Sequence, residues 1–188
     1  EPHLNGPFGD MPALIRLAGE NTPRVVCGQG TAPAGATIKH YREEGLDMIP
    51  GSGLLATVIP GAFDAWMLLL RDHGRLPLRD IFEPAIFYAR QGHPVLPRVS
   101  ETISGLGDFF KDEWPTSFAT WLPGGAAPKA NALFTNPDLA NMWDRLLIEA
   151  ETKSSRTAQI DAARHIFYKG FIAEAIDNYL REACVMDA

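Results

Sequence analysis

The sequence contains little of what disulfide frameworks, zinc sites and membrane spans require. Its 188 residues include two cysteines, Cys27 and Cys184, which lie far apart and have no companion at a metal-binding spacing. No apolar run approaches the roughly 18 residues of a membrane-spanning helix. The formal net charge is −6, and no lysine or arginine cluster overrides it. We therefore expect neither a membrane span nor a nucleic-acid partner.

The common catalytic motifs are missing as well. The chain has no GxSxG, HExxH or P-loop, and Gly28-Gln29-Gly30 lacks the third glycine of a dinucleotide-binding fingerprint. The five histidines are scattered, and none has a second ligand three or four residues away. Most acidic residues fall on polar helix faces, where solvation explains them. We therefore expect no metal and no cofactor, and residue chemistry alone predicts a scaffold without a reaction.

Length and composition indicate one domain that spans residues 1–188. Hydrophobic residues make up 46% of the chain and charged residues 21%, which is ordinary for a globular protein. Both ends are typical of a truncated sequence, because the chain starts at Glu1 within a loop-like segment and stops in an apolar run. A signal peptide would lie outside this sequence. The compartment, cytoplasmic or periplasmic, stays open.

The stretch Val25–Thr37 has the pattern of a strand, a tight turn and a helix N-terminus. Thr31 is placed as the N-cap residue, and Pro33 falls in the first helical turn. Such a turn exposes backbone N–H groups that can hold an anion or a carboxylate. The alternative is an ordinary connection between a strand and a helix.

The rest of the chain is predicted to be mostly helical. Residues 12–17 and 24–27 have the pattern of a β-hairpin. Helices are expected over residues 34–44, 60–73, 81–91, 99–110, 136–151, 158–168 and 171–183, and mostly loop over residues 112–135. Asn136 is the expected cap of its helix, and Ile81, Ala85, Ile86 and Ala89 are the expected apolar stripe of theirs. A purely helical fold would not explain the hairpin, so the predicted fold class is α+β.

A set of short motifs, in conserved order along nearly the whole chain, resembles the γ-glutamyltranspeptidase family. Thr31–Thr37 (TAPAGAT) resembles the TAPAAAT that follows the family's substrate-binding D-F-R-E segment. Ile59-Pro60-Gly61 is similar to its VPG helix start. Further matches are Glu1–Asp10 with the EPxxxGxGGG segment, Asp72–Val95 with the EPAIxxAxxGFPV region, Asn136–Ala140 with NPDLA, and Phe167–Gly170 with FYxG.

This resemblance implies part of the large chain of an N-terminal-nucleophile (Ntn) hydrolase with an αββα sandwich, here a mostly helical fragment with one β-hairpin. Family members are made as a precursor that cuts itself before a threonine. The freed threonine begins the small chain, its hydroxyl attacks the amide, and its α-amine is the base. That threonine would lie beyond Ala188, so the expected partners are this small chain and a small-molecule amide. We expect the fragment alone to be inactive.

One departure from the family pattern concerns substrate binding. Where the resemblance places the arginine that holds the α-carboxylate of a γ-glutamyl group, this chain has Gln29. A neutral amide replaces a charged bidentate contact worth roughly 1.5–3 kcal/mol. We therefore hypothesise a substrate other than a typical γ-glutamyl compound, as for a cephalosporin-acylase-type or small-amide enzyme. Phe8 also departs from the glycine-rich segment and is expected to narrow the pocket.

Two alternatives stay open at this stage. A basic residue outside this sequence could replace the missing arginine. Alternatively, the chain is a non-enzymatic helical scaffold that has kept the family fold and lost the chemistry. The presence or absence of a processing threonine in the complete coding sequence separates the enzyme from the scaffold.

Overall fold

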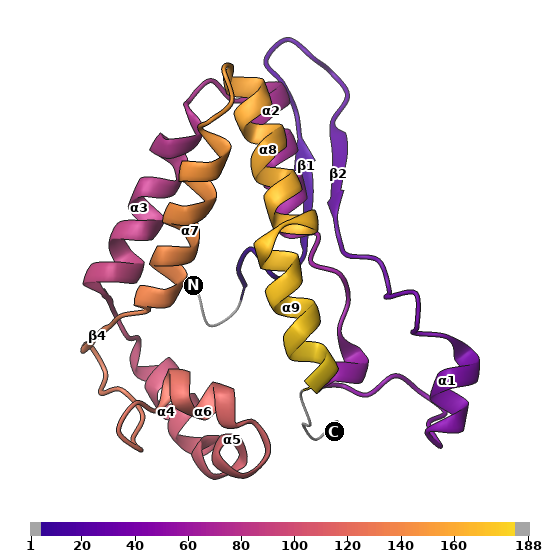
Figure 1. The fold of residues 1–188 in the computed structure, drawn as a ribbon, viewed down its shortest axis with the longest axis vertical. Helices are drawn as coiled ribbons and strands as arrows, with labels where there is room; N and C mark the ends of the chain where they lie inside the picture. Colours follow the sequence, from indigo (N-terminus) through magenta and orange to yellow (C-terminus); the bar gives the residue numbers. More distant parts are fainter. Residues whose placement is uncertain (1–4, 183–188) are drawn as a thin grey trace. The chain divides into compact units, whose positions relative to one another are not determined.

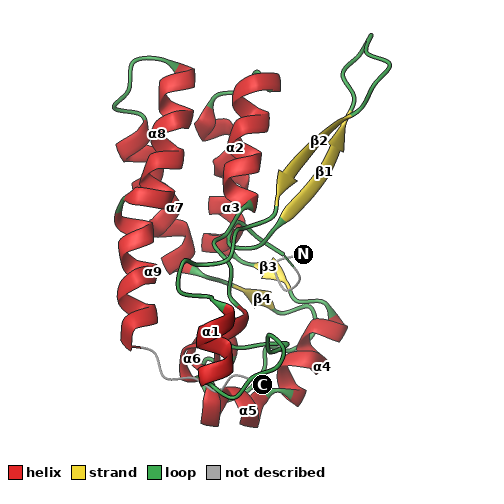
Figure 2. Ribbon diagram, turned by 90° about the vertical axis from the view of Figure 1, so that its right-hand side faces the viewer, coloured by secondary structure: helices red, strands yellow, loops and turns green. Residues whose placement is uncertain are grey.

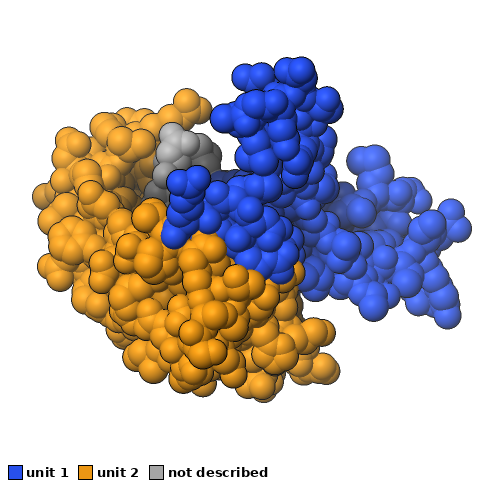
Figure 3. Space-filling model, turned by 90° about the horizontal axis from the view of Figure 1, so that it is seen from above, with its two compact units in different colours: residues 1–75, 187–188 blue, residues 76–186 orange. Residues whose placement is uncertain are grey.

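The computed structural model describes residues 5–182, which form two compact units that divide after Arg75 (Figure 3). The expected motif residues 1–4 and the end of the last predicted helix, from residue 183, lie outside the described residues. Helices dominate the described part of the chain, and its strands form two small antiparallel sheets (Figures 1 and 2). The α+β fold class is therefore confirmed. The assignment of residues 1–188 to a single domain stays a prediction.

The first unit is built on the predicted hairpin. Strand β1 (Met11–Ile15) pairs antiparallel with β2 (Arg24–Gly28), and Leu14 lies opposite Val25. Residues alternate between a half-buried face and an exposed face, as the period of two in a strand dictates. Leu14 and Val25 are 72% and 74% exposed. One face of the hairpin thus carries an open apolar pair.

The helices of the first unit begin later than the sequence predicts. Helix α1 covers Ile38–Glu43, because the side chain of Thr37, and not that of Thr31, accepts the first capping hydrogen bond from the N–H of His40 at 3.1 Å. A short 3₁₀ helix, η1 (Leu54–Ala56), follows. Helix α2 covers Ala62–His73 and buries Phe63, Met67 and Leu70, among others. The predicted position of Pro60 in the first turn of this helix is wrong.

The main core of the second unit lies among four helices. They are α3 (Leu78–Gln91), α7 (Pro137–Ala150), α8 (Arg156–Lys169) and α9 (Phe171–Glu182). Helix α3 packs against α7, α7 packs against α8, and α8 packs against α9. Leu146, Leu147 and Ile160 are fully buried between them. The cap at Asn136 is confirmed, because its Oδ1 accepts from the N–H of Leu139 at 3.0 Å.

The inward stripe predicted for α3 is half wrong. Ile86 and Ala89 are buried, but Ile81 is 42% exposed and Ala85 is exposed as well. Leu78 and Phe82 are buried in their place. The helix starts at Leu78, three residues earlier than predicted, and packs against α7. The ring of Phe82 meets Trp143 of α7 edge-on at 5.3 Å.

A second cluster of buried residues joins the region of the helix predicted over 99–110 to the region predicted as mostly loop over 112–135. It contains α4 (Pro97–Gly105), α5 (Gly107–Glu113), α6 (Pro115–Trp121) and a two-stranded sheet of β3 (His93–Pro94) and β4 (Leu133–Phe134). The predicted helix over 99–110 is therefore two helices, and the predicted loop over 112–135 contains α6 and β4. Aromatic packing explains the difference: Trp121 stacks on Phe134 with 4.9 Å between ring centroids.

Candidate functional site

Three segments that carry the family-like motifs meet in the first unit. The N–H groups of Gly61 and Ala62 both donate to the carbonyl of Gly9 at 3.1 Å. The N–H of Ile59 donates to the carbonyl of Thr31 at 3.0 Å. The glycine-rich loop before β1, the segment after β2 and the start of α2 are thereby tied together through backbone atoms.

At the centre of this meeting point are Gly28, Gly30 and Gly61, which we call the glycine junction. A Cβ on Gly61 would lie 2.4 Å from the carbonyl oxygen of Gly28 and 2.7 Å from the carbonyl carbon of Gln29. A Cβ on Gly30 would lie 1.6 Å from the carbonyl oxygen of Ile59. No side chain fits at such distances, so the glycines allow two backbones to touch directly.

Gln29 lies between two glycines of the junction, just beyond the end of β2. Its backbone packs against Gly61, whereas its side chain is exposed. The thiol of Cys27, two residues earlier and also exposed, donates to Oε1 of Gln29 at 3.6 Å. The amide of Gln29 can offer a ligand both its NH₂ group and the second lone pair of Oε1. The predicted role of Gln29 in substrate binding stays a prediction.

The second departure from the family pattern lies at the same place. Phe8 is 43% exposed and directly precedes Gly9, whose carbonyl holds the start of α2. Both unusual residues thus flank one backbone junction. Sequence reasoning named Gln29 and Phe8 but missed Gly61 as their support, although the Ile59-Pro60-Gly61 motif was a signal for it.

The sequence predicts an anion site at a helix N-terminus after Thr31, but no helix starts there. Residues 31–36 form no helix, and the first helical turn starts at Ile38. The N–H groups of Ala36 and Thr37 are used in local turns, donating to Pro33 and Gly35 at 3.0 and 2.9 Å. These amides are therefore already committed to backbone partners.

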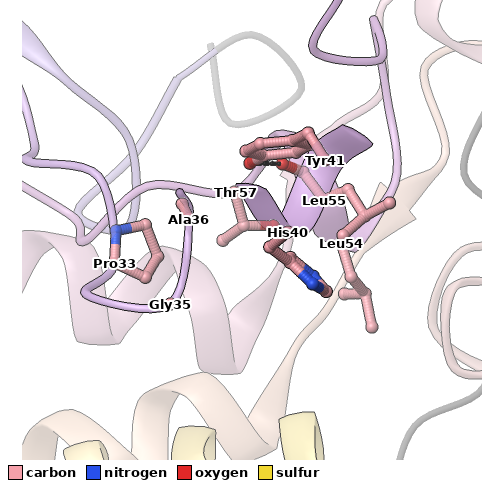
Figure 4. A pocket seen from close by; sticks show the side chains of 8 residues that line it. All are labelled: Pro33, Gly35, Ala36, His40, Tyr41, Leu54, Leu55 and Thr57. Carbon is pink, nitrogen blue, oxygen red and sulfur yellow. Dashed lines mark hydrogen bonds between the residues drawn. The ribbon is translucent and has the colours of Figure 1, made fainter. Parts of the chain in front are cut away.

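The TAPAGAT segment instead lines a pocket of about 370 Å³ (Figure 4). Its walls are mostly apolar and are formed by Pro33, Gly35, Ala36, His40, Tyr41, Leu54, Leu55 and Thr57. The hydroxyl of Tyr41 donates to the carbonyl of Leu55 at 2.7 Å, which ties α1 to η1. This pocket suits an apolar group and presents no pair of carboxylates for acid–base chemistry.

Within residues 5–182, no three side chains of histidine, cysteine, aspartate or glutamate gather in a way that could hold a metal ion. In the same part of the chain, no helix combines the length and apolar character that crossing a bilayer requires.

A match to a family model shows the family to which the chain belongs. The γ-glutamyltranspeptidase family model matches residues 1–185. The chain belongs to the γ-glutamyltranspeptidase family. The resemblance inferred from the ordered motifs is thus confirmed, and the junction around Gln29 is a feature of a family member.

Solved structures agree with this assignment. LmbA2991 superimposes with a TM-score of 0.95 and 51% identity, covering 100% of this chain and 32% of that one. A cephalosporin acylase from Bacillus halodurans follows with a TM-score of 0.80 and 26% identity, covering 97% of this chain and 32% of that one. The Helicobacter pylori γ-glutamyltranspeptidase shares the fold, with a TM-score of 0.79 over 96% of this chain and 49% of that one, at 22% identity.

Curated relatives include both hydrolase and acylase precursors. The glutathione hydrolase-like YwrD proenzyme of Bacillus subtilis (strain 168) is 29% identical over 185 residues, which are 96% of this chain and 31% of that protein. The acylase ACY 1 proenzyme of Pseudomonas sp. (strain SE83) is 33% identical over 135 residues, 66% of this chain and 24% of that protein. The chain thus spans about a third or less of the length of these relatives.

Proposed function

We propose that this chain is part of the large chain of an Ntn amide hydrolase or acyltransferase that matures from a precursor. Membership of the γ-glutamyltranspeptidase family supports this function, as do relatives named as proenzymes. The αββα sandwich of the complete enzyme would combine the described helices and small sheets with strands contributed by the remainder of the precursor.

In this proposal the reaction itself belongs to the small chain. The hydroxyl of its N-terminal threonine attacks the carbonyl carbon of the amide, and its α-amine takes the proton. The amine leaves, and water or an acceptor amine then releases the acyl group. The present chain contributes binding and orientation of the acyl donor.

The substrate we propose is an amide other than a typical γ-glutamyl compound. The observation that carries this proposal is Gln29, an exposed neutral amide where the family motif has arginine. An arginine holds a carboxylate through an ion pair with two parallel hydrogen bonds, whereas a glutamine amide carries no positive charge and lacks this bidentate geometry. Similarity to two acylases also supports an acyl donor other than a typical γ-glutamyl compound.

Maturation is the first point to test. Intact-mass measurement and N-terminal sequencing of the complete gene product should give two chains, the smaller beginning with threonine. A single uncut chain without a threonine at the junction would instead favour a scaffold that has lost catalysis.

Substrate preference is the second point. We expect the mature enzyme to hydrolyse γ-glutamyl-p-nitroanilide and 4-aminobutanoyl-p-nitroanilide, which differ by the α-carboxylate, with similar kcat/KM. Gln29→Arg should raise the preference for the carboxylate-bearing substrate by about tenfold or more. Fast hydrolysis of glutathione by the unmodified enzyme would refute this part of the proposal.

A further inference from the structure

The glycine junction points to a residue that acts on the substrate through Gln29. We propose that Gly61 is a positioning residue, whose missing side chain sets where Gln29 presents its amide. This inference rests on the proposed role of Gln29 in binding the acyl donor. The two residues are 32 positions apart in the sequence and belong to different elements of the first unit.

The contact is direct and involves the backbone of Gln29 itself. A Cβ on Gly61 would approach the carbonyl carbon of Gln29 to 2.7 Å and that of Gly28 to 2.7 Å as well. Real Cβ atoms do not lie below 3.0 Å from such neighbours, so the peptide that carries Gln29 would have to move. Because backbone atoms cannot swing aside as a flexible side chain can, the displacement passes to the Gln29 side chain.

The peptide before Gln29 is also held by packing on its other side, so a Cβ on Gly61 would displace it in a defined direction. Gly28 is buried, and a Cβ there would lie 2.7 Å from both the Ala65 side chain and the carbonyl of Met11. The peptide before Gln29 is therefore packed against α2 and β1. Gly61 is itself held by the hydrogen bond from its N–H to Gly9.

The backbone conformation of Gly61 makes an alanine substitution there a specific test of the contact with Gln29. Its φ of −102° and ψ of −21° are accessible to any residue, so alanine there introduces no backbone strain of its own. Gly74, at the opposite end of α2, is a matched control. Its φ is −82°, and a Cβ there would lie 2.8 Å from the carbonyl oxygen of Leu70, a similar clash about 20 Å away along the helix axis.

The experiment is a double-mutant cycle on the mature enzyme. Gly61→Ala should raise KM by about two- to tenfold, the effect of one misplaced hydrogen bond, and leave kcat within about twofold. Gly74→Ala should leave KM unchanged. In a Gln29→Ala background, Gly61→Ala should have no further effect on KM, because the positioned side chain is gone. Intact mass of each variant verifies that it has matured.

The outcomes distinguish this inference from the proposed function. If Gln29→Ala leaves KM unchanged, the proposed role of Gln29 fails. If Gln29→Ala raises KM but Gly61→Ala does not, or the two effects on KM multiply, the positioning role alone is overturned. Should Gly61→Ala fail to mature, Ala65→Ser adds one oxygen atom under Gly28 and displaces the same peptide more gently; an unchanged KM there overturns the inference too.

Discussion

Replacing Gly30 by alanine tests whether the two backbones of the glycine junction touch. The new Cβ would lie 1.6 Å from the carbonyl oxygen of Ile59, about 1.8 Å inside ordinary contact distance. Overpacking of this kind costs about 1–3 kcal/mol. The displacement would also strain the hydrogen bond from Ile59 to Thr31, worth about 0.5–1.5 kcal/mol. Alanine also lowers the conformational entropy of the unfolded chain relative to glycine, which offsets about 0.4–1 kcal/mol of this loss in stability.

The net expectation is a destabilisation of about 1–3 kcal/mol, read as a melting temperature lowered by several degrees in the complete protein. Gly35→Ala is the matched control, because no atom lies within 4 Å of its Cβ position and its φ is not left-handed. This variant should melt at or slightly above the temperature of the unmodified protein. Equal melting temperatures for the two variants would show that the close approach at Gly30 is not real.

Three further predictions concern the second unit, each measured by thermal melting of the complete protein. Leu146→Ala should cost about 2–5 kcal/mol because this side chain is fully buried. Ile148 is 65% exposed on the same helix, so Ile148→Ala should change stability by less than about 0.5 kcal/mol. Similar losses for the two variants would contradict the described core. Asn136→Ala should cost about 1 kcal/mol through loss of the helix cap, and Asn136→Ser should restore most of it. Glu151→Gln should cost at most about 1 kcal/mol, since its ion pair with Arg79 is partly exposed, and the loss should shrink in high salt.

The pH dependence of that ion pair has a definite sign. The hydrogen bond to Glu151 raises the pKa of Arg79 above its ordinary value. A raised pKa means that the arginine contributes stability at every pH below its ordinary pKa and loses it only as the pH rises through the raised one. Arg79 should therefore cause no change in melting temperature between pH 6 and pH 9.

Sequence patterns predicted the elements whose signals are local. The hairpin has alternating residues, and helix α7 has a capping asparagine followed by proline and an apolar stripe, so both were found. The start of α1 was missed because Thr31 and Thr37 are equally good caps, and only tertiary contacts choose between them. The start of α2 was missed because Gly9, some fifty residues away, binds its first amides.

Long-range contacts also explain what was missed between α3 and α7. Residues 112–135 contain five proline and glycine residues, which favour loop. The stacking of Trp121 on Phe134 and the pairing of His93 with Phe134 stabilise structure there regardless. Gln29 was found as a candidate because it breaks a family motif. Its support by Gly61 was not, since the Ile59-Pro60-Gly61 motif indicates a helix start and carries no sign of a contact with a residue 32 positions earlier.

The way Gln29 is held has an evolutionary consequence. Its packing contacts run through backbone atoms, which every amino acid shares, while its side chain is exposed and fills no space in the core. With the role proposed for Gln29, exchange at this position alters recognition at little cost in folding, whereas exchange at the buried Gly28 or at Gly30 also costs folding stability. A lineage with such a division can explore new acyl groups one substitution at a time on an unaltered frame.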